Sequence, residues 1–324
     1  MTRRLLWLDN LKGFLIILVV LGHSVQCLNP DFQKDILFRY IYSFHMPLFI
    51  FVSGYACYRE TIKFEMIKKR YLQLMIPYIV WSIIIFITQG HLRLWEMFVY
   101  PERSLWFLYV LFIITLIHVA CVKVSKMVDF HEELFVSIIA IALFVSMFIF
   151  RSFGYPIIAK FFLYYCLGFY LRKHFSFQNR KSILIYGTLG VFMILAYFCM
   201  QGSVPSFMPS DSSIVYRYVY NTIVALMGIM AFMFLFANKL DGHRLFLTKM
   251  GGATLAIYTI HRSLGMFLVY KLIDIIEFDV TALTTAQYYI VVFVTCVILL
   301  LFSLLLNYLL DKGRVTRILF LGKK

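Results

Sequence analysis

Residues 9 to 23 read DNLKGFLIILVVLGH, and this stretch decides how the rest of the chain is interpreted. Its apolar run, Phe14 to Leu21, separates a charged start, which contains Asp9 and Lys12, from the imidazole of His23. Eleven residues from Lys12 to His23 make about three helical turns, so both side chains project from one helix face. Ionisable groups in hydrocarbon are unfavourable by at least ~2 kcal/mol and typically mark a functional position.

The rest of the sequence is apolar along almost its whole length. Hydrophobic residues make up 62% of the chain, aromatic residues 19% and charged residues only 15%. Apolar windows of about 17 to 25 residues recur, and each is long enough to cross a hydrocarbon core of about 30 Å. We predict an all-α polytopic membrane protein, a bundle of about ten transmembrane helices. The predicted spans are residues 11–29, 36–58, 72–89, 104–122, 134–150, 155–171, 182–200, 213–237, 253–274 and 286–310.

The distribution of basic residues predicts the orientation of the chain. With the N-terminus inside, 22 of the 31 Lys and Arg residues fall in cytoplasmic segments, as the positive-inside rule requires. We therefore expect both termini in the cytoplasm, and a single transmembrane domain over residues 1–324 with no appended soluble domain. Topology and anionic lipid headgroups explain the net charge of +15, so the bilayer is the expected partner and nucleic acid is not.

The six cysteines do not form a metal-binding pattern. They are dispersed, mostly within apolar spans, with no CxxC spacing and no adjacent histidine ligands. We interpret them as small apolar core residues and expect no metal site.

The second predicted span carries another imidazole, His45, two residues before Pro47. His45 lies about 14 Å inside the span by helical rise, a depth comparable with that of His23. Pro47 permits a kink that would open a polar cavity, and Ser53 follows on the same span. The competing interpretation is a helix-packing bend with a satisfied histidine.

The ninth predicted span places polar residues at helical spacing. Thr254, Tyr258, His261 and Gly265 recur at steps of four, three and four, so they line one face. Arg262 is adjacent, and a third intramembrane histidine beside a guanidinium indicates anion or hydroxyl handling.

Two other segments admit both a functional and an ordinary interpretation. Arg103 and Trp106 lie at the start of the fourth span, at the outer surface. They form either a binding surface for a sugar or an ordinary aromatic belt with an arginine that reaches toward the membrane surface. Lys69 and Arg70 precede the third span, either as positive-inside charge or as ligands of a phosphorylated molecule.

Five ordered motifs together resemble the integral-membrane acyltransferase 3 family, and most closely its fucose 4-O-acetylase branch. The resemblance spans the whole chain. The motifs are Asp9 to His23; Phe44-His45-Met46-Pro47-Leu48-Phe49 with Ser53-Gly54; Lys69-Arg70 leading to Ile76-Pro77-Tyr78; Ser104 to Leu108; and Thr254-Leu255 to Tyr258 with His261.

This resemblance implies a bundle of ten helices in the bacterial cytoplasmic membrane. Such proteins take an acyl group, usually acetyl, from cytoplasmic acyl-CoA and deliver it to an extracytoplasmic hydroxyl, commonly on a cell-surface glycan or lipid-linked sugar. The family's basic-residue-X10-His motif falls on Lys12 and His23, although many members have Arg at the first position. Many larger members carry an additional extracytoplasmic hydrolase-like domain, so dependence on a second protein, such as a glycan-assembly protein, stays open here.

The residue chemistry is consistent with that activity. Lys12, Lys69 and Arg70 would neutralise the phosphates of the acyl-CoA donor, and Asp9 would orient Lys12. His23 is our predicted general base for the acceptor hydroxyl. The remaining candidates are His45 as a second catalytic residue and, for the acceptor or the oxyanion, Ser53, Arg103, Trp106, Tyr258, His261 and Arg262.

Alternative functions remain open at this point. We prefer direct transfer, because no Ser-His-Asp set is legible, but an acyl-histidine intermediate is an alternative. The chain could instead be a transporter or exporter of a glycan or small solute, with His23, His45 and His261 relaying protons. A scaffold whose polar residues only pack helices is a third interpretation.

Overall fold

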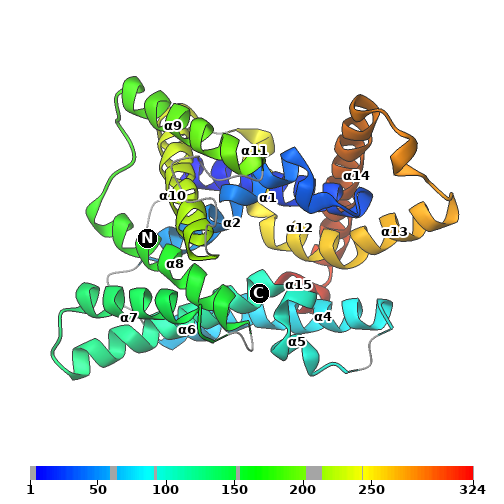
Figure 1. The fold of residues 1–324 in the computed structure, drawn as a ribbon. Coiled ribbons are helices and arrows are strands. Elements are labelled where there is room, and N and C mark those ends of the chain that lie inside the picture. The colour runs from blue at the N-terminus through cyan, green and yellow to red at the C-terminus, as the bar shows by residue number, and fades with distance from the viewer. Residues whose placement is uncertain are drawn as a thin grey trace. The chain divides into compact units, whose positions relative to one another are not determined.

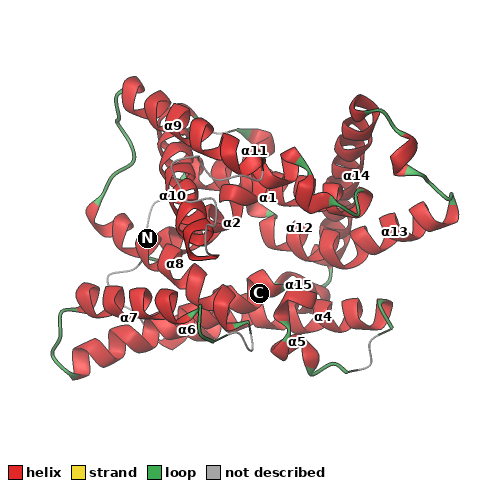
Figure 2. Ribbon diagram, viewed as in Figure 1, coloured by secondary structure: helices red, strands yellow, loops and turns green. Residues whose placement is uncertain are grey.

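The computed structural model describes residues 5–58, 64–90, 93–150, 154–201, 214–242 and 244–323. Throughout this part of the chain the regular structure is helical, as Figure 2 shows, which confirms the predicted all-α class. The α-helices are α1 (Leu6–Leu28), α2 (Ile36–Cys57), α3 (Phe64–Arg70), α4 (Ile76–Thr88), α5 (Glu96–Val99), α6 (Trp106–Met127), α7 (Glu132–Ser146), α8 (Tyr155–His174), α9 (Ser182–Met200), α10 (Ile214–Lys239), α11 (Leu245–Gly252), α12 (Thr254–Ile260), α13 (Met266–Ile275), α14 (Thr285–Lys312) and α15 (Arg314–Leu321). Short helical turns are η1 (Phe32–Lys34), η2 (Tyr71–Met75), η3 (Pro101–Arg103), η4 (His261–Gly265) and η5 (Val280–Ala282).

Seven described helices are long and apolar enough to cross a membrane. Each coincides with one of the ten predicted spans; they are Leu6–Leu28, Ile36–Cys57, Ile67–Thr88, Trp106–Met127, Ser182–Met200, Arg217–Lys239 and Thr285–Lys312. The other three predicted spans, residues 134–150, 155–171 and 253–274, also contain helices. In the first of these spans α7 has only 15 residues, and in the last a π-helical turn separates α12 from α13. At 1.5 Å per residue α7 is about 22 Å long, which is short of a hydrocarbon core. The count of ten and the cytoplasmic termini stay predictions, and residues 1–4 and 324 lie outside the described part.

The helices form two compact units. Unit 1 comprises residues 1–49, 176–261 and 268–302, and unit 2 comprises residues 50–175, 262–267 and 303–324. In unit 1, α1 packs against α10, α11 and α12, and α9 lies beside α10 (Figure 1). A Cβ at Gly13 would collide with the Leu247 carbonyl, and one at Gly251 with the Asp9 carbonyl, so small residues let α1 and α11 approach closely.

A buried amide holds α1 to the segment between α10 and α11. Asn10 is completely buried, and its Nδ2 donates to the carbonyl oxygens of Leu240 and Gly242, both at 2.8 Å. Its Oδ1 accepts from the Thr248 hydroxyl at 2.7 Å. Because buried polar groups without partners are costly, this satisfied network fixes the rotation of α1 beside Asp9 and Lys12.

In unit 2 a proline explains the irregular start of α4. Pro77 has no N–H to donate to the carbonyl one turn earlier, and the chain forms the π-helical turn Tyr71–Met75 just before it. Gly322, at φ +62°, packs directly on the Gln73 backbone, where a Cβ would lie 2.6 Å from the carbonyl oxygen. Trp81 Nε1 donates to the Phe320 carbonyl at 3.0 Å, so α15 is fixed against α4.

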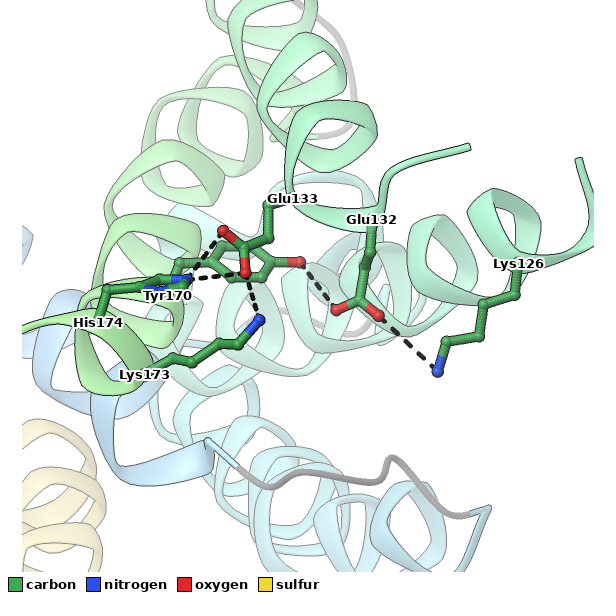
Figure 3. Close-up of polar contacts among 6 residues, drawn as sticks. All are labelled: Lys126, Glu132, Glu133, Tyr170, Lys173 and His174. Carbon is green, nitrogen blue, oxygen red and sulfur yellow. Dashed lines mark hydrogen bonds and ion pairs between the residues drawn. The ribbon is translucent and has the colours of Figure 1, made fainter. Parts of the chain in front are cut away.

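Ionic contacts join α6, α7 and α8 within unit 2, as Figure 3 shows. Glu133 Oε1 accepts from Lys173 at 2.5 Å and from His174 Nε2 at 2.8 Å. Glu132 accepts from the Tyr170 hydroxyl at 3.3 Å and lies 3.8 Å from Lys126 Nζ. Partial burial alone would raise the pKa of Glu133, but the hydrogen bonds from Lys173 and His174 lower it below its ordinary value.

Candidate active site

The basic end of the predicted site lies in the first turns of α1. Lys12 Nζ is 3.9 Å from Asp9 Oδ1, and the two side chains are only 26% and 15% exposed. This is the contact that their three-residue spacing predicts. Because α1 is continuous from Leu6 to Leu28, Lys12 and His23 are separated by about 16 Å along the axis and by about 20° around it. Both are partly accessible on a helix whose neighbouring side chains are mostly buried.

His23 contacts His261 directly. Its Nδ1 lies 2.8 Å from His261 Nε2, and the two rings stack with centroids 5.0 Å apart and an interplanar angle of 26°. The His23 ring comes from α1 and the His261 ring from the start of η4, directly after α12, and α1 packs against α12. His261 is completely buried, whereas His23 is half-buried. A half-buried imidazole held by a second ring can accept a proton from a hydroxyl presented to it.

The backbone around His261 is irregular. The ninth predicted span is not one regular helix, because α12 ends at Ile260 and His261 begins the π-helical turn His261–Gly265. Such turns occur often at functional positions. His261 Nδ1 is 2.5 Å from the Ile257 carbonyl oxygen, and the Tyr258 ring lies edge-on to His261 at 6.0 Å. Tyr258, one of the predicted acceptor residues, thus lies beside His261.

His45 is also buried in unit 1, but its contacts are different. Its Nδ1 lies 2.7 Å from the Ile41 carbonyl oxygen, and its ring is edge-on to Tyr42 at 4.5 Å. Tyr42 also covers Gly22, since a Cβ there would lie 2.9 Å from the tyrosine ring. His45 thus contacts Tyr42, which lies against α1 at Gly22, whereas His261 contacts His23 directly.

The other predicted site residues belong to unit 2, and contacts within that unit are seen for Arg70, Arg103, Trp106 and Arg262. Their part in the site stays a prediction. Lys69 is exposed, Ser53 is half-buried, and the Arg70 guanidinium contacts Cys57 Sγ. Arg103 pairs with Glu96 at 2.9 Å and lies over the Tyr100 ring, Trp106 stacks on Phe161 at 5.4 Å, and Arg262 lies 3.9 Å from Met266 Sδ.

Sequence reasoning missed two groups that position the site. Asn10, beside Asp9, fixes α1 by three hydrogen bonds, and the Ile257 carbonyl orients His261. An asparagine in the first turns of an apolar helix is a visible signal, because it needs internal partners. The role of a backbone carbonyl has no such signal in the sequence.

These observations define a class of protein, a helical, multi-pass membrane protein. Its helices bring two histidines, His23 and His261, into contact, and α1 carries the Lys12–Asp9 pair. A family model described as "Acyltransferase domain" matches residues 5–307, which run through both units. The chain therefore belongs to the acyltransferase 3 family.

Two curated relatives match part of the chain. The nodulation protein NolL of Sinorhizobium fredii is 28% identical over 211 residues, which cover 59% of this chain and 55% of that protein. The nodulation protein NolL of Mesorhizobium japonicum is 26% identical over 221 residues, covering 60% of this chain and 55% of that protein. The chain thus matches about half the length of these relatives. No solved structure matches it significantly.

Proposed function

We propose that this chain is a membrane O-acyltransferase of the bacterial cytoplasmic membrane. It moves an acetyl or other small acyl group from cytoplasmic acyl-CoA to a hydroxyl of an extracytoplasmic glycan or lipid-linked sugar. Family membership supports acyl transfer, and apolar helices long enough to cross a bilayer support the membrane location. The observation that carries the proposal is the contact between His23 and His261, because His23 lies on α1, the same helix that presents Lys12.

The proposed roles follow from charge and position along α1. Lys12, kept in place by Asp9, neutralises donor phosphate at one end of the helix. Lys69 and Arg70, which belong to unit 2, stay predicted ligands of the donor phosphates, and the Arg70 guanidinium contacts Cys57. About three turns further along α1, His23 lies where an extended pantetheine arm would present its thioester.

The proposed reaction is direct transfer with His23 as general base. His23 takes the proton of the acceptor hydroxyl as the acceptor oxygen bonds to the acyl carbon. The carbon–sulfur bond then breaks, and the CoA thiolate takes the proton from His23 and leaves as a thiol. Candidates to stabilise the oxyanion or bind the acceptor are His45, Ser53, Arg262, Tyr258, Arg103 and Trp106.

The names of the relatives do not select an acceptor. "Nodulation protein" names a biological process and not a reaction, and each relative is matched over only about half its length. We therefore propose the acceptor by class only, as an envelope glycan or lipid-linked sugar, with glycan-assembly proteins as partners.

The test supplies membranes containing the protein with acetyl-CoA labelled in its acetyl group. We expect label in the extracted glycan and lipid-linked sugar fractions, and no O-acetyl signal in a strain carrying His23→Ala. Equal labelling with and without the protein would contradict the proposal. The alternative, a transporter that uses intramembrane histidines, predicts instead a solute flux that needs no acyl-CoA.

A further inference from the structure

We propose that His261 is a positioning residue for His23, holding it in the tautomer whose Nε2 accepts the substrate proton. The inference rests on the proposed function of His23 as general base. It assigns His261 a role different from the oxyanion contact expected from the sequence. Three groups carry the argument: the Ile257 carbonyl, the His261 ring and the His23 ring.

The first step concerns His261 and the backbone. A carbonyl oxygen only accepts hydrogen bonds, so His261 Nδ1, 2.5 Å from the Ile257 oxygen, must carry a proton and donate it. In a neutral imidazole the other ring nitrogen then has the lone pair. His261 Nε2 is therefore a hydrogen-bond acceptor.

The second step transfers this constraint to His23. His23 Nδ1 lies 2.8 Å from the accepting His261 Nε2, so His23 Nδ1 must be the protonated donor. The lone pair of a neutral His23 then lies on Nε2. The backbone carbonyl of Ile257 thus determines, through two rings, which nitrogen of His23 acts as the base.

The third step concerns charge during the reaction. When Nε2 takes the acceptor proton, His23 becomes an imidazolium and its Nδ1–H bond to His261 becomes charge-assisted, which strengthens it. His261 is completely buried and His23 is half-buried, so the charge is better placed on His23. An interaction that strengthens as the transition state forms accelerates the reaction. We expect its loss to lower kcat about 10- to 100-fold.

The same geometry argues against an oxyanion contact by His261. An oxyanion needs donors, but His261 Nε2 accepts from His23 and His261 Nδ1 donates to Ile257. His261 therefore takes the place that an orienting carboxylate has in other base-assisted sites, without adding a negative charge inside the helices.

The direct test is nitrogen NMR of the full-length protein in detergent, with both imidazole nitrogens labelled and His23 assigned by His23→Gln. We expect His23 in the Nδ1–H form. We expect His261→Leu to abolish this preference and His261→Gln to keep it, because the glutamine oxygen replaces Nε2 as an acceptor. An Nε2–H form of His23 in the unsubstituted protein, or a tautomer unchanged by His261→Leu, would overturn the proposal.

The kinetic arm uses the acetyl transfer assay on the same variants. We expect His261→Leu to lower kcat about 10- to 100-fold with little change in KM for acetyl-CoA, and His261→Gln to restore most of it. His118→Gln is the matched control, because His118 is equally buried but in unit 2. Equal loss in the Leu and Gln variants, with both folded, would contradict a positioning role. If the unsubstituted protein transfers no acyl group, the proposed function fails, and the NMR result still decides the tautomer.

Discussion

Two histidine contacts of the same length have different surroundings, one in each unit. His23 and His261 lie 2.8 Å apart in unit 1, and His174 and Glu133 lie 2.8 Å apart in unit 2. His261 is completely buried, whereas the His174 side chain is 54% exposed beside Lys173. Water and salt screen the second contact more strongly than the first, in which one ring is completely buried. The comparison teaches that burial and donor–acceptor roles, and not contact length, indicate which histidine contact is suited to catalysis.

The largest expected effect is the loss of acetyl transfer on substitution of His23, and it tests the difference between the two contacts. His23→Ala should lower acetyl transfer about 10²- to 10⁴-fold, the usual contribution of a general base. His174→Ala should keep the rate within about twofold, because it changes an exposed side chain outside the proposed site. The measurement is the initial rate of label transfer in membranes containing equal amounts of each protein. Similar losses in both variants would refute the distinction between the two contacts.

A second change tests the support of the buried region. Asn10→Leu should lower the free energy of unfolding by about 1–3 kcal/mol, because Leu240, Gly242 and Thr248 lose a buried partner. Thr248→Val removes only one of these bonds and should have a smaller effect. The measurement is unfolding of the purified proteins in detergent. An Asn10→Leu protein as stable as the parent would show that the network does not hold α1.

A third change perturbs unit 2 without touching the histidine pair. Gly322→Ala places a Cβ at φ +62° and 2.6 Å from the Gln73 oxygen. We expect about 1–2 kcal/mol of destabilisation from the left-handed backbone conformation, with further loss if α15 shifts. The KM for acetyl-CoA should remain unchanged. Thermal unfolding and the transfer assay on one preparation check both expectations, and a changed KM with unchanged stability would be inconsistent with them.

The smallest effect is expected at Glu133. Its pKa is lowered in the folded protein, so the stabilisation is present above the ordinary carboxyl pKa and is lost as pH falls through the lowered value. Glu133→Gln should therefore lower the melting temperature slightly at neutral pH and have no effect at acidic pH below that range. Acetyl transfer should not change. A Glu133→Gln difference that grows as the pH falls would contradict this sign.

Much of the membrane architecture was predictable because it depends on local composition. Apolar windows located the seven described helices that are long and apolar enough to cross a membrane, and the spacing of Asp9 and Lys12 predicted their contact. The helical repeat placed Lys12 and His23 on one face of α1, which is continuous through both. These features need only the period of a helix and the thickness of a bilayer.

The details of the site were less predictable, because they depend on packing between distant segments. His23 and His261 are 238 positions apart, and their contact follows from how α1 packs on α12. Spacing within the ninth span could place Tyr258 and His261 on one face but could not predict the π-helical turn that begins at His261. The hydrogen bond to Ile257 involves a backbone group, which residue type cannot identify.

The most direct test of the account measures acetyl-CoA binding and turnover on the same preparations of Lys12→Ala and His23→Gln. If α1 presents a donor-binding charge at one end and a base further along, Lys12→Ala should weaken acetyl-CoA binding about tenfold, and His23→Gln should bind normally without transferring the acetyl group. Unchanged donor binding in Lys12→Ala, together with normal turnover in His23→Gln, would contradict the account.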